Sequence, residues 1–116
     1  MARDPHSLLP LNPRAFYILL ALAEQENHGY AIAKSVEAAT DGIVRLTAGT
    51  RYPLVRQMLA DGWIAECGVA RDQDPRRRMY RLTPWGTRVA QAEAARLAQA
   101  VRMAAKTRLL PAGALS

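Results

Sequence analysis

Apolar positions follow a helical period near the start of the chain. They recur at intervals of three and four residues, at Phe16, Leu19, Leu20 and Ala23. This spacing is that of one face of an α-helix. Asn12 and Pro13 come directly before it and are typical of an N-cap followed by a first helical residue. The pattern predicts a first helix that begins at Pro13.

A second apolar face is formed by Ile32, Val36 and Ala39. The pattern opens at His28-Gly29-Tyr30 and closes at Asp41-Gly42, since glycine adopts the left-handed conformation past a helix end. His28 stands at the helix start, where capping or packing is expected of it rather than a role as a catalytic base. Residues 43–46 are β-prone but too few for more than an extended connector or an edge strand.

A third helical segment ends at Asp61-Gly62, and its start has two candidate N-caps, Thr47 and Thr50. With Thr50 as the N-cap, Pro53 is the third helical residue, where its missing N–H breaks no hydrogen bond. With Thr47 as the N-cap, Pro53 lies a turn inside and the helix must distort. The sequence leaves both starts open.

Two β-prone runs, residues 63–69 and 79–82, flank a charged segment and predict a hairpin. Thr83 and Pro84 then begin a long last helix. Three helices, a hairpin and a long helix are the order of a winged helix-turn-helix with an appended helix. The predicted fold is mainly α with a small β-hairpin, a winged helix-turn-helix plus a long C-terminal dimerisation helix.

The chain is divided into one small domain and its flanking segments. We predict a mobile N-terminal arm at 1–11, a winged helix-turn-helix DNA-binding domain at 12–82, a C-terminal dimerisation helix at 83–110 and a tail at 111–116. The 116 residues include 22 alanines, so bulky apolar side chains are few. A chain of this size with so modest a core often buries further surface against a partner chain.

Charge is distributed unevenly along the chain. The net charge is +6, but residues 1–41 carry three basic and five acidic side chains and the remaining 75 residues carry 13 and five. Fourteen of the 16 basic residues are arginine, the residue type that forms paired hydrogen bonds with phosphates and guanine edges. The +8 segment therefore favours a polyanion as partner, and double-stranded DNA fits the predicted fold.

Composition argues against several classes of protein. Two histidines and one cysteine allow neither a disulfide framework nor an all-protein zinc site. No nucleophile–base pair or glycine-rich phosphate loop is evident, so we expect neither an enzyme nor a cofactor or metal site. The longest apolar run, residues 15–23, is far shorter than a membrane span. With its unpaired Cys67, the chain is expected in the cytoplasm.

The third helix and the hairpin carry the candidate DNA-binding residues. On a helical wheel Thr50, Pro53 and Gln57 lie opposite the core side formed by Val55, Met58 and Leu59. Gln57 can pair with adenine, and Arg56 can bind guanine or a phosphate. Arg51 lies near the core side and either extends past it to solvent or reaches DNA, and we expect DNA. The hairpin tip carries three consecutive arginines, Arg76, Arg77 and Arg78, for which a solvated loop is the alternative.

The last helix carries a stripe of small and apolar residues that predicts a dimer interface. We assign to this interface Phe16, Val89, Ala94, Leu97, Val101 and Ala105. Alternatives are a flap over the chain's own core and an amphipathic helix on a membrane. A stripe made mostly of alanine buries little apolar area for strong membrane binding.

Four motifs in order carry a resemblance to a known family. They are His28-Gly29-Tyr30, Gly49-Thr50-Arg51-Tyr52-Pro53, Asp61-Gly62-Trp63-Ile64 and the run from Arg77 to Gly86. Together they resemble the PadR family of bacterial transcriptional regulators, in its short form with a single C-terminal helix. The resemblance implies a homodimeric repressor at an inverted-repeat operator, dimerised by the C-terminal helix, from which a small-molecule effector often releases the DNA.

The resemblance also implies roles for single residues. Tyr30 would bond a phosphate, Thr50, Tyr52 and Pro53 would line the groove-facing start of the recognition helix, and Arg77 and Tyr80 match the basic wing. Arg51 departs from the family, which usually carries an aliphatic residue there. A winged-helix module that binds an acidic protein instead of specific DNA is the alternative function.

Three further residues have an expected role in packing. Trp63 is predicted in the core, and Cys67 is predicted as a small buried residue on a strand rather than a redox sensor. Trp85, at the start of the last helix, is predicted to pack in the core as well. Its alternative role is to line an effector cavity between subunits.

Overall fold

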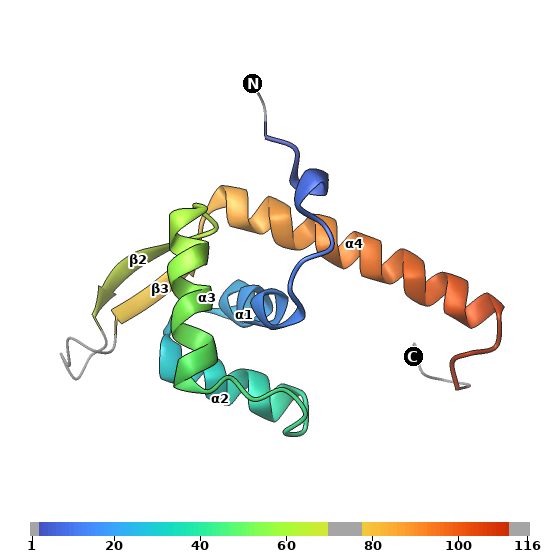
Figure 1. Ribbon diagram of the computed structural model, residues 1–116, viewed down its shortest axis with the longest axis horizontal. Helices are drawn as coiled ribbons and strands as arrows, with labels where there is room; N and C mark the ends of the chain where they lie inside the picture. The colour runs from blue at the N-terminus through green and yellow to red at the C-terminus, as the bar shows by residue number, and fades with distance from the viewer. Residues whose placement is uncertain (1–2, 70–77, 112–116) are drawn as a thin grey trace.

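The computed structural model describes residues 3–69 and 78–111. Its elements are a 3₁₀-helix η1 (Pro5–Leu8), α1 (Pro13–Glu24), β1 (Asn27–His28), α2 (Gly29–Ala39), α3 (Ala48–Ala60), β2 (Ile64–Val69), β3 (Arg78–Leu82) and α4 (Pro84–Lys106). The strands form one antiparallel sheet in the order β1-β3-β2. Figure 1 shows α1, α2 and α3 gathered beside this sheet, with α4 extending beyond them. The predicted fold, mainly α with a small sheet and a long last helix, is confirmed.

Side-chain caps begin three of the helices, as predicted. The Asn12 side chain accepts from the N–H of Arg14 at 2.9 Å and opens α1. His28 Nδ1 accepts from the N–H of Ala31 at 3.2 Å and opens α2, so His28 has the expected capping role. Thr83 Oγ1 accepts from the N–H of Gly86 at 2.9 Å and opens α4. Each cap satisfies a backbone donor that has no partner inside its helix.

α3 begins after the earlier of the two candidate N-caps, which gives the longer helix. Thr47 is the N-cap and Pro53 lies inside the helix. The side chain of Thr47 makes no capping hydrogen bond to the helix backbone, although its carbonyl accepts from the N–H of Arg51 at 2.8 Å. Because Pro53 has no N–H, the Gly49 carbonyl lacks its usual helical donor.

A third strand, β1, was missed by the sequence analysis, which predicted a two-stranded hairpin. Asn27 pairs with Tyr80 and His28 with Met79, so β3 lies in the middle of the sheet. Two residues between two helices carry no strand pattern, and the pairing arises only because the α1–α2 turn lies beside β3. Residues 43–46 form no strand and connect α2 to α3.

The core lies between α1, α2, α3, the sheet and the first half of α4. Its fully buried side chains include Ile18, Leu19, Ile32, Met58 and Val89. Phe16 and Val89, at 9% and 0% exposed, both belong to this core of a single chain. Their assignment to the dimer interface was therefore wrong, because Phe16 on α1 and Val89 on α4 are both buried by packing within one chain.

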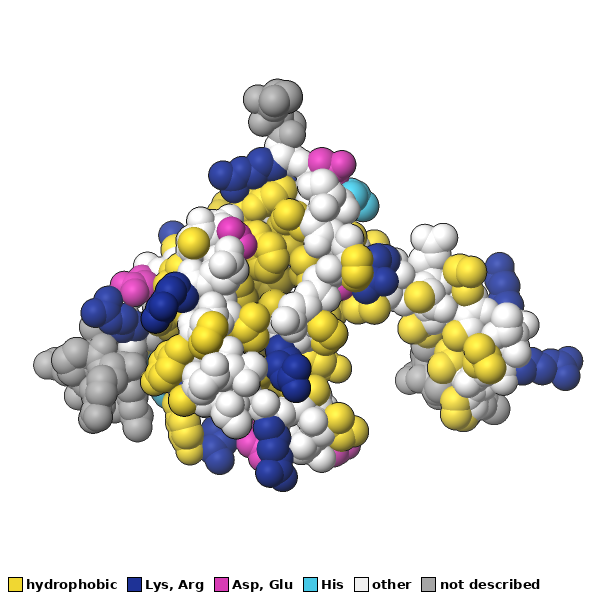
Figure 2. All heavy atoms as spheres, in the orientation of Figure 1, with side chains coloured by type: hydrophobic (Ala, Val, Ile, Leu, Met, Phe, Trp, Pro, Cys, Tyr) yellow, Lys and Arg dark blue, Asp and Glu magenta, His cyan; other side chains and the backbone are white. Residues whose placement is uncertain are grey.

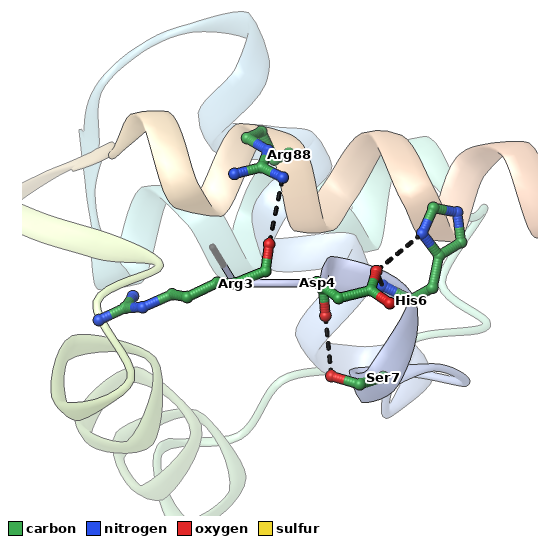
Figure 3. Close-up of polar contacts among 5 residues, drawn as sticks. All are labelled: Arg3, Asp4, His6, Ser7 and Arg88. Carbon is green, nitrogen blue, oxygen red and sulfur yellow. Dashed lines mark hydrogen bonds and ion pairs between the residues drawn. The ribbon is translucent and has the colours of Figure 1, made fainter. Parts of the chain in front are cut away.

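The N-terminal arm lies against α4, where a mobile segment was predicted. The Asp4 carboxylate caps η1 by accepting from the N–H of His6 at 2.9 Å. Arg88 of α4 donates to the backbone oxygen of Arg3 at 3.2 Å (Figure 3). The guanidinium carbons of Arg3 and Arg88 lie 5.2 and 5.3 Å from the centre of the Trp85 ring, within the range of cation–π attraction.

A buried carboxylate joins the end of the arm to α4. Glu93, 2% exposed, accepts from the N–H of Leu11 at 2.9 Å. The Arg96 guanidinium also donates to both of its oxygens. The hydrogen bond from Arg96, together with that from Leu11, lowers the pKa of Glu93 against the opposing effect of burial.

Of the glycines in the described part of the chain, Gly86 at the start of α4 lies closest to other backbone. A Cβ on Gly86 would lie 1.9 Å from the carbonyl oxygen of Trp63. Beside it, the Thr83 hydroxyl donates to the carbonyl of Gly62, and the N–H of Thr83 donates to the carbonyl of Trp63 at 3.1 Å. The first turn of α4 is thereby fixed to the segment that joins α3 to β2.

Gly86→Ala should destabilise the protein, by about 3 kcal/mol or more, because the new Cβ meets backbone that cannot rotate away. The matched control is Gly49→Ala, since a Cβ on Gly49 meets nothing within 4 Å. That control should be neutral or stabilising by about 0.5–1 kcal/mol. Chemical denaturation of both variants measures the difference, and equal stabilities would contradict the packing described here.

Glu93→Gln should lower the free energy of unfolding at neutral pH by about 1–3 kcal/mol, the range for a hydrogen bond to a charged group. Because folding lowers the pKa of Glu93, the stability it contributes is present above its ordinary pKa and is lost as the pH falls through the lowered value. The difference between wild type and variant should therefore shrink in acid. Denaturant titrations over a pH series measure it, and a difference independent of pH would contradict the prediction.

Candidate nucleic-acid interface

α3 presents one polar face to solvent and buries the other. Val55 and Met58 are buried and Leu59 is half-buried against the core, on the side that the helical wheel predicted. Among the residues predicted to face DNA, Thr50 is half-buried, and four are exposed, namely Tyr52, Pro53, Arg56 and Gln57. The exposed side thus combines an aromatic ring, a guanidinium and an amide on one helix.

Gln57 is held by a neighbour on the same helix. Its amide nitrogen donates to both carboxylate oxygens of Asp61 at 3.0 Å. The two side chains are exposed and four residues apart, the spacing at which side chains meet on a helix. Gln57 must leave Asp61 before its amide can donate to a base, and solvent makes such an exchange inexpensive.

Tyr30 lies in the first turn of α2 and is 56% exposed. The ammonium of Lys34, one turn later, lies 5.6 Å from the centre of its ring. A hydroxyl and a cation therefore stand together at the start of α2. Lys34 was not predicted as a site residue from the sequence, although its position four residues after Tyr30 places both on one helix face.

Arg78 carries the described part of the predicted basic wing. It begins β3 and donates from one guanidinium nitrogen to both carboxylate oxygens of Glu66 on β2, at 3.2 and 3.3 Å. Both side chains are about half exposed, and an exposed pair of this kind contributes little stability. A phosphate could therefore replace Glu66 as the partner of Arg78 with little loss of stability. Arg76 and Arg77 lie outside the described residues.

Tyr80, the other predicted wing residue, is half-buried at the centre of the sheet. It pairs with Asn27 of β1 and with Glu66 of β2 and packs against the core. Burial, followed by the nearby Glu66 carboxylate, raises the pKa of its phenol. The ring of Tyr80 therefore supports the sheet as part of the protein interior.

Arg51 occupies a position that differs from the expectation. It is 8% exposed, and one guanidinium nitrogen donates to the Leu46 carbonyl at 3.2 Å. Its guanidinium carbon lies 5.0 Å from the centre of the Tyr52 ring, and a Cβ on Gly29 would lie 3.1 Å from Arg51 Nε. Arg51 is thus held between α2 and α3 rather than on the exposed face of α3, and its expected contact with DNA stays a prediction.

The second half of α4 has no buried residue in the chain as described. The four that the helix buries, Gly86, Val89, Ala92 and Glu93, all lie in its first half. Of the remaining predicted interface residues, Ala94 and Ala105 are exposed, and Leu97 and Val101 are half-buried. Figure 2 shows hydrophobic side chains on the outer part of α4, where Met103 is 63% exposed. The flap alternative therefore accounts for the first half of α4 only.

Cys67 has surroundings that differ from the prediction, whereas those of Trp85 agree with it. Cys67 is exposed, with its Sγ 3.6 Å from a Glu26 carboxylate oxygen, so the expectation of a buried residue was wrong. Trp85 is half-buried against the core, as is Trp63, which agrees with their predicted packing. Trp85 also lines a cavity of about 360 Å³ with residues of the arm and of the α3 end.

Two absences hold for residues 3–69 and 78–111. No group of three or more His, Cys, Asp or Glu side chains is placed to hold a metal ion. None of the helices is both long enough and apolar enough to cross a membrane.

Comparison with known proteins agrees with the motifs. The model of the PadR-like family of transcriptional regulators matches residues 18–92. A search of curated proteins by sequence finds no significant match.

Solved structures of several regulators have a similar fold. A transcriptional regulator from Clostridium thermocellum superposes with a TM-score of 0.67 at 24% identity, over 79% of this chain and 89% of that protein. A PadR-like transcription factor from Bacteroides fragilis gives 0.68 at 21% identity, over 81% and 88%. A PadR-like regulator from Bacillus cereus gives 0.68 at 20% identity, over 84% and 92%. At these identities the likeness supports the fold.

Proposed function

The chain belongs to the PadR-like family of transcriptional regulators, and from this premise we propose that it is a repressor that binds specific DNA as a homodimer in the cytoplasm. The observation that carries the proposal is the exposed side of α3. Tyr52, Pro53, Arg56 and Gln57 are open to solvent while Val55 and Met58 anchor the same helix in the core. A helix so divided can enter a major groove without disturbing its own packing.

Each side chain of this face has a role in the proposal. Gln57 reads adenine and Arg56 reads guanine or holds a phosphate. Thr50, Tyr52 and Pro53 line the groove at the start of α3. Tyr30 and the arginines of the wing, Arg76, Arg77 and Arg78, bind the backbone, where contacts fix the orientation of the protein without reading sequence.

The outer half of α4 forms the proposed dimer. It extends beyond the rest of the domain (Figure 1) and carries Leu97, Val101, Ala94 and Ala105. Alanines allow two helices to approach closely, and the larger residues supply the apolar area. A two-fold dimer of this kind fits an inverted-repeat operator whose half-sites are about one helical turn apart, or a multiple of one turn.

Release by a small-molecule effector is the last part of the proposal, and the family resemblance supports it. Trp85 is the candidate contact, because it is aromatic, half-buried and lines a cavity of about 360 Å³. Titration of candidate ligands into the complex with DNA tests this part separately from DNA binding.

Gln57→Ala and Arg78→Ala should affect DNA binding in different ways. After selection of an operator from a random pool, Gln57→Ala should lose discrimination at one base position, by about 1–3 kcal/mol. Arg78→Ala should weaken binding to all sequences and lower the log–log salt slope by about 0.9. Binding titrations at several salt concentrations measure both effects.

The control for both variants is Arg102→Ala, an exposed arginine near the far end of α4. It should bind like wild type. If the wild-type protein selects no sequence from the pool, the proposal of specific DNA binding is wrong. The basic surface would then favour binding to an acidic protein.

Leu97→Glu combined with Val101→Glu should separate the dimer, because charged side chains would have to be buried in the interface. Binding to the full operator should weaken strongly while a single half-site is bound as before, since two linked half-site contacts reinforce each other. Analytical ultracentrifugation measures the oligomeric state. Gln99→Glu on the polar side of α4 is the control, and a double variant that stays dimeric would contradict this interface.

A further inference from the structure

Arg51 is a buried cation without an anionic partner among the described residues. Its side chain is 8% exposed, its Nε is buried without a hydrogen-bond partner, and its guanidinium has one hydrogen bond, to the neutral carbonyl of Leu46. The ring of Tyr52 adds a cation–π contact. Burying an unpaired charge is expensive. An anion that binds from outside the chain would pair with this charge and account for its burial.

A cavity adjoins this cation. It has a volume of about 390 Å³ and is lined by one side of α2, the connector between α2 and α3, and the first turn of α3. Its charged lining residues are Lys34, Arg45, Arg51 and Glu37. Glu37 faces the Arg45 guanidinium at 3.8 Å. Three cations against one carboxylate leave a surplus of positive charge around the cavity.

The first turn of α3 adds backbone donors at the same place. Thr47 and Ala48 line the cavity, and the Thr47 side chain makes no capping hydrogen bond to α3. Instead its hydroxyl donates to that of Thr50 at 3.3 Å. The N–H groups of Ala48 and Gly49 have no partner inside the helix, because the first turn never supplies one. They and the helix dipole favour an anion at this end of α3.

We propose that this cavity binds one phosphate group of the operator backbone. The exposed side chains of Lys34 and Arg45 bind this phosphate, and the buried guanidinium of Arg51 adds positive charge beside it. The N–H groups of Ala48 and Gly49 donate to its oxygens. The inference rests on the proposed DNA binding and extends it to Lys34, Arg45 and the α3 start. The cavity adjoins Tyr30, the residue expected on a phosphate, so one phosphodiester can be held from both α2 and α3.

Two variants test the cavity without disturbing the fold. Ala48→Pro removes one N–H, and proline is favoured at a first helical position. The preceding Thr47, with φ −64° and ψ 161°, already has the extended conformation that a following proline requires. Lys34→Gln removes one charge from an exposed side chain. Circular dichroism and thermal unfolding should match wild type for both.

Operator binding provides the first measurement. Ala48→Pro should weaken binding by about tenfold or more, because a donor to a charged oxygen is lost. Lys34→Gln should lower the log–log salt slope by about 0.9. The controls are Ala48→Ser, which keeps the N–H, and Lys106→Gln, which changes the chain's other lysine at the far end of α4. Both controls should bind like wild type.

A neutral phosphate analogue locates the contact. Methylphosphonate replaces one phosphate of the operator at a time. At one position in each half-site this replacement should weaken operator binding by the wild type. At the same position it should not weaken binding by Lys34→Gln any further. If wild type binds its operator and Ala48→Pro and Lys34→Gln bind equally well at every salt concentration, the phosphate site is wrong while specific DNA binding stands.

If wild type binds no operator, the proposed function is wrong, and the binding of inorganic phosphate then tests the cavity independently of DNA. In a nuclear magnetic resonance titration with inorganic phosphate, the amide signals of Ala48 and Gly49 should then shift in the wild type. In the double variant that combines Ala48→Pro and Lys34→Gln, the amide signal of Gly49 should not shift. That result supports a site for phosphate from another source. Unshifted amides in wild type would overturn the site altogether.

Discussion

The contact between the first turn of α4 and the backbone of Trp63 is the constraint on which the rest of the structure depends. Gly86 has no Cβ, so the two backbones approach more closely than any other residue would allow, and Thr83 caps α4 while its hydroxyl bonds Gly62. The end of α3, the start of β2 and the start of α4 meet here. Their junction fixes the direction of α4 and, in the proposed dimer, the separation of the two recognition helices.

Features that depend on neighbouring residues could be predicted from the sequence. The caps at Asn12, His28 and Thr83 each act within three residues of the helix they open, so type and spacing suffice to find them. β1 could not be predicted, because two residues have no period. Its pairing with β3 depends on how α1 and α2 pack, which no local pattern encodes. The close approach of the Gly86 and Trp63 backbones is likewise visible only in the folded chain.

The candidate site was predictable to the same extent. The helical period correctly separated the buried Val55 and Met58 from the exposed side of α3. It could not show whether Arg51, at the boundary, turns inward or outward, and the sequence left solvent and DNA open, with DNA expected. Nor could the stripe on α4 show where packing within the chain ends, because Val89 and Leu97 share one pattern. Val89 is fully buried in the protomer core, whereas Leu97 is half-buried and packs against the edge of that core.

Arg51 gives the interface a property that an aliphatic residue would lack. A buried guanidinium lowers stability when it has no anion, and this penalty falls when a phosphate is bound nearby, so stabilisation and DNA binding are linked. The same helix carries Arg56 and Gln57 on its exposed side. A phosphate held at the N-terminus of α3 would fix how deeply and at what angle the helix enters the groove. Contacts without sequence information would thereby decide which base edges Arg56 and Gln57 can reach.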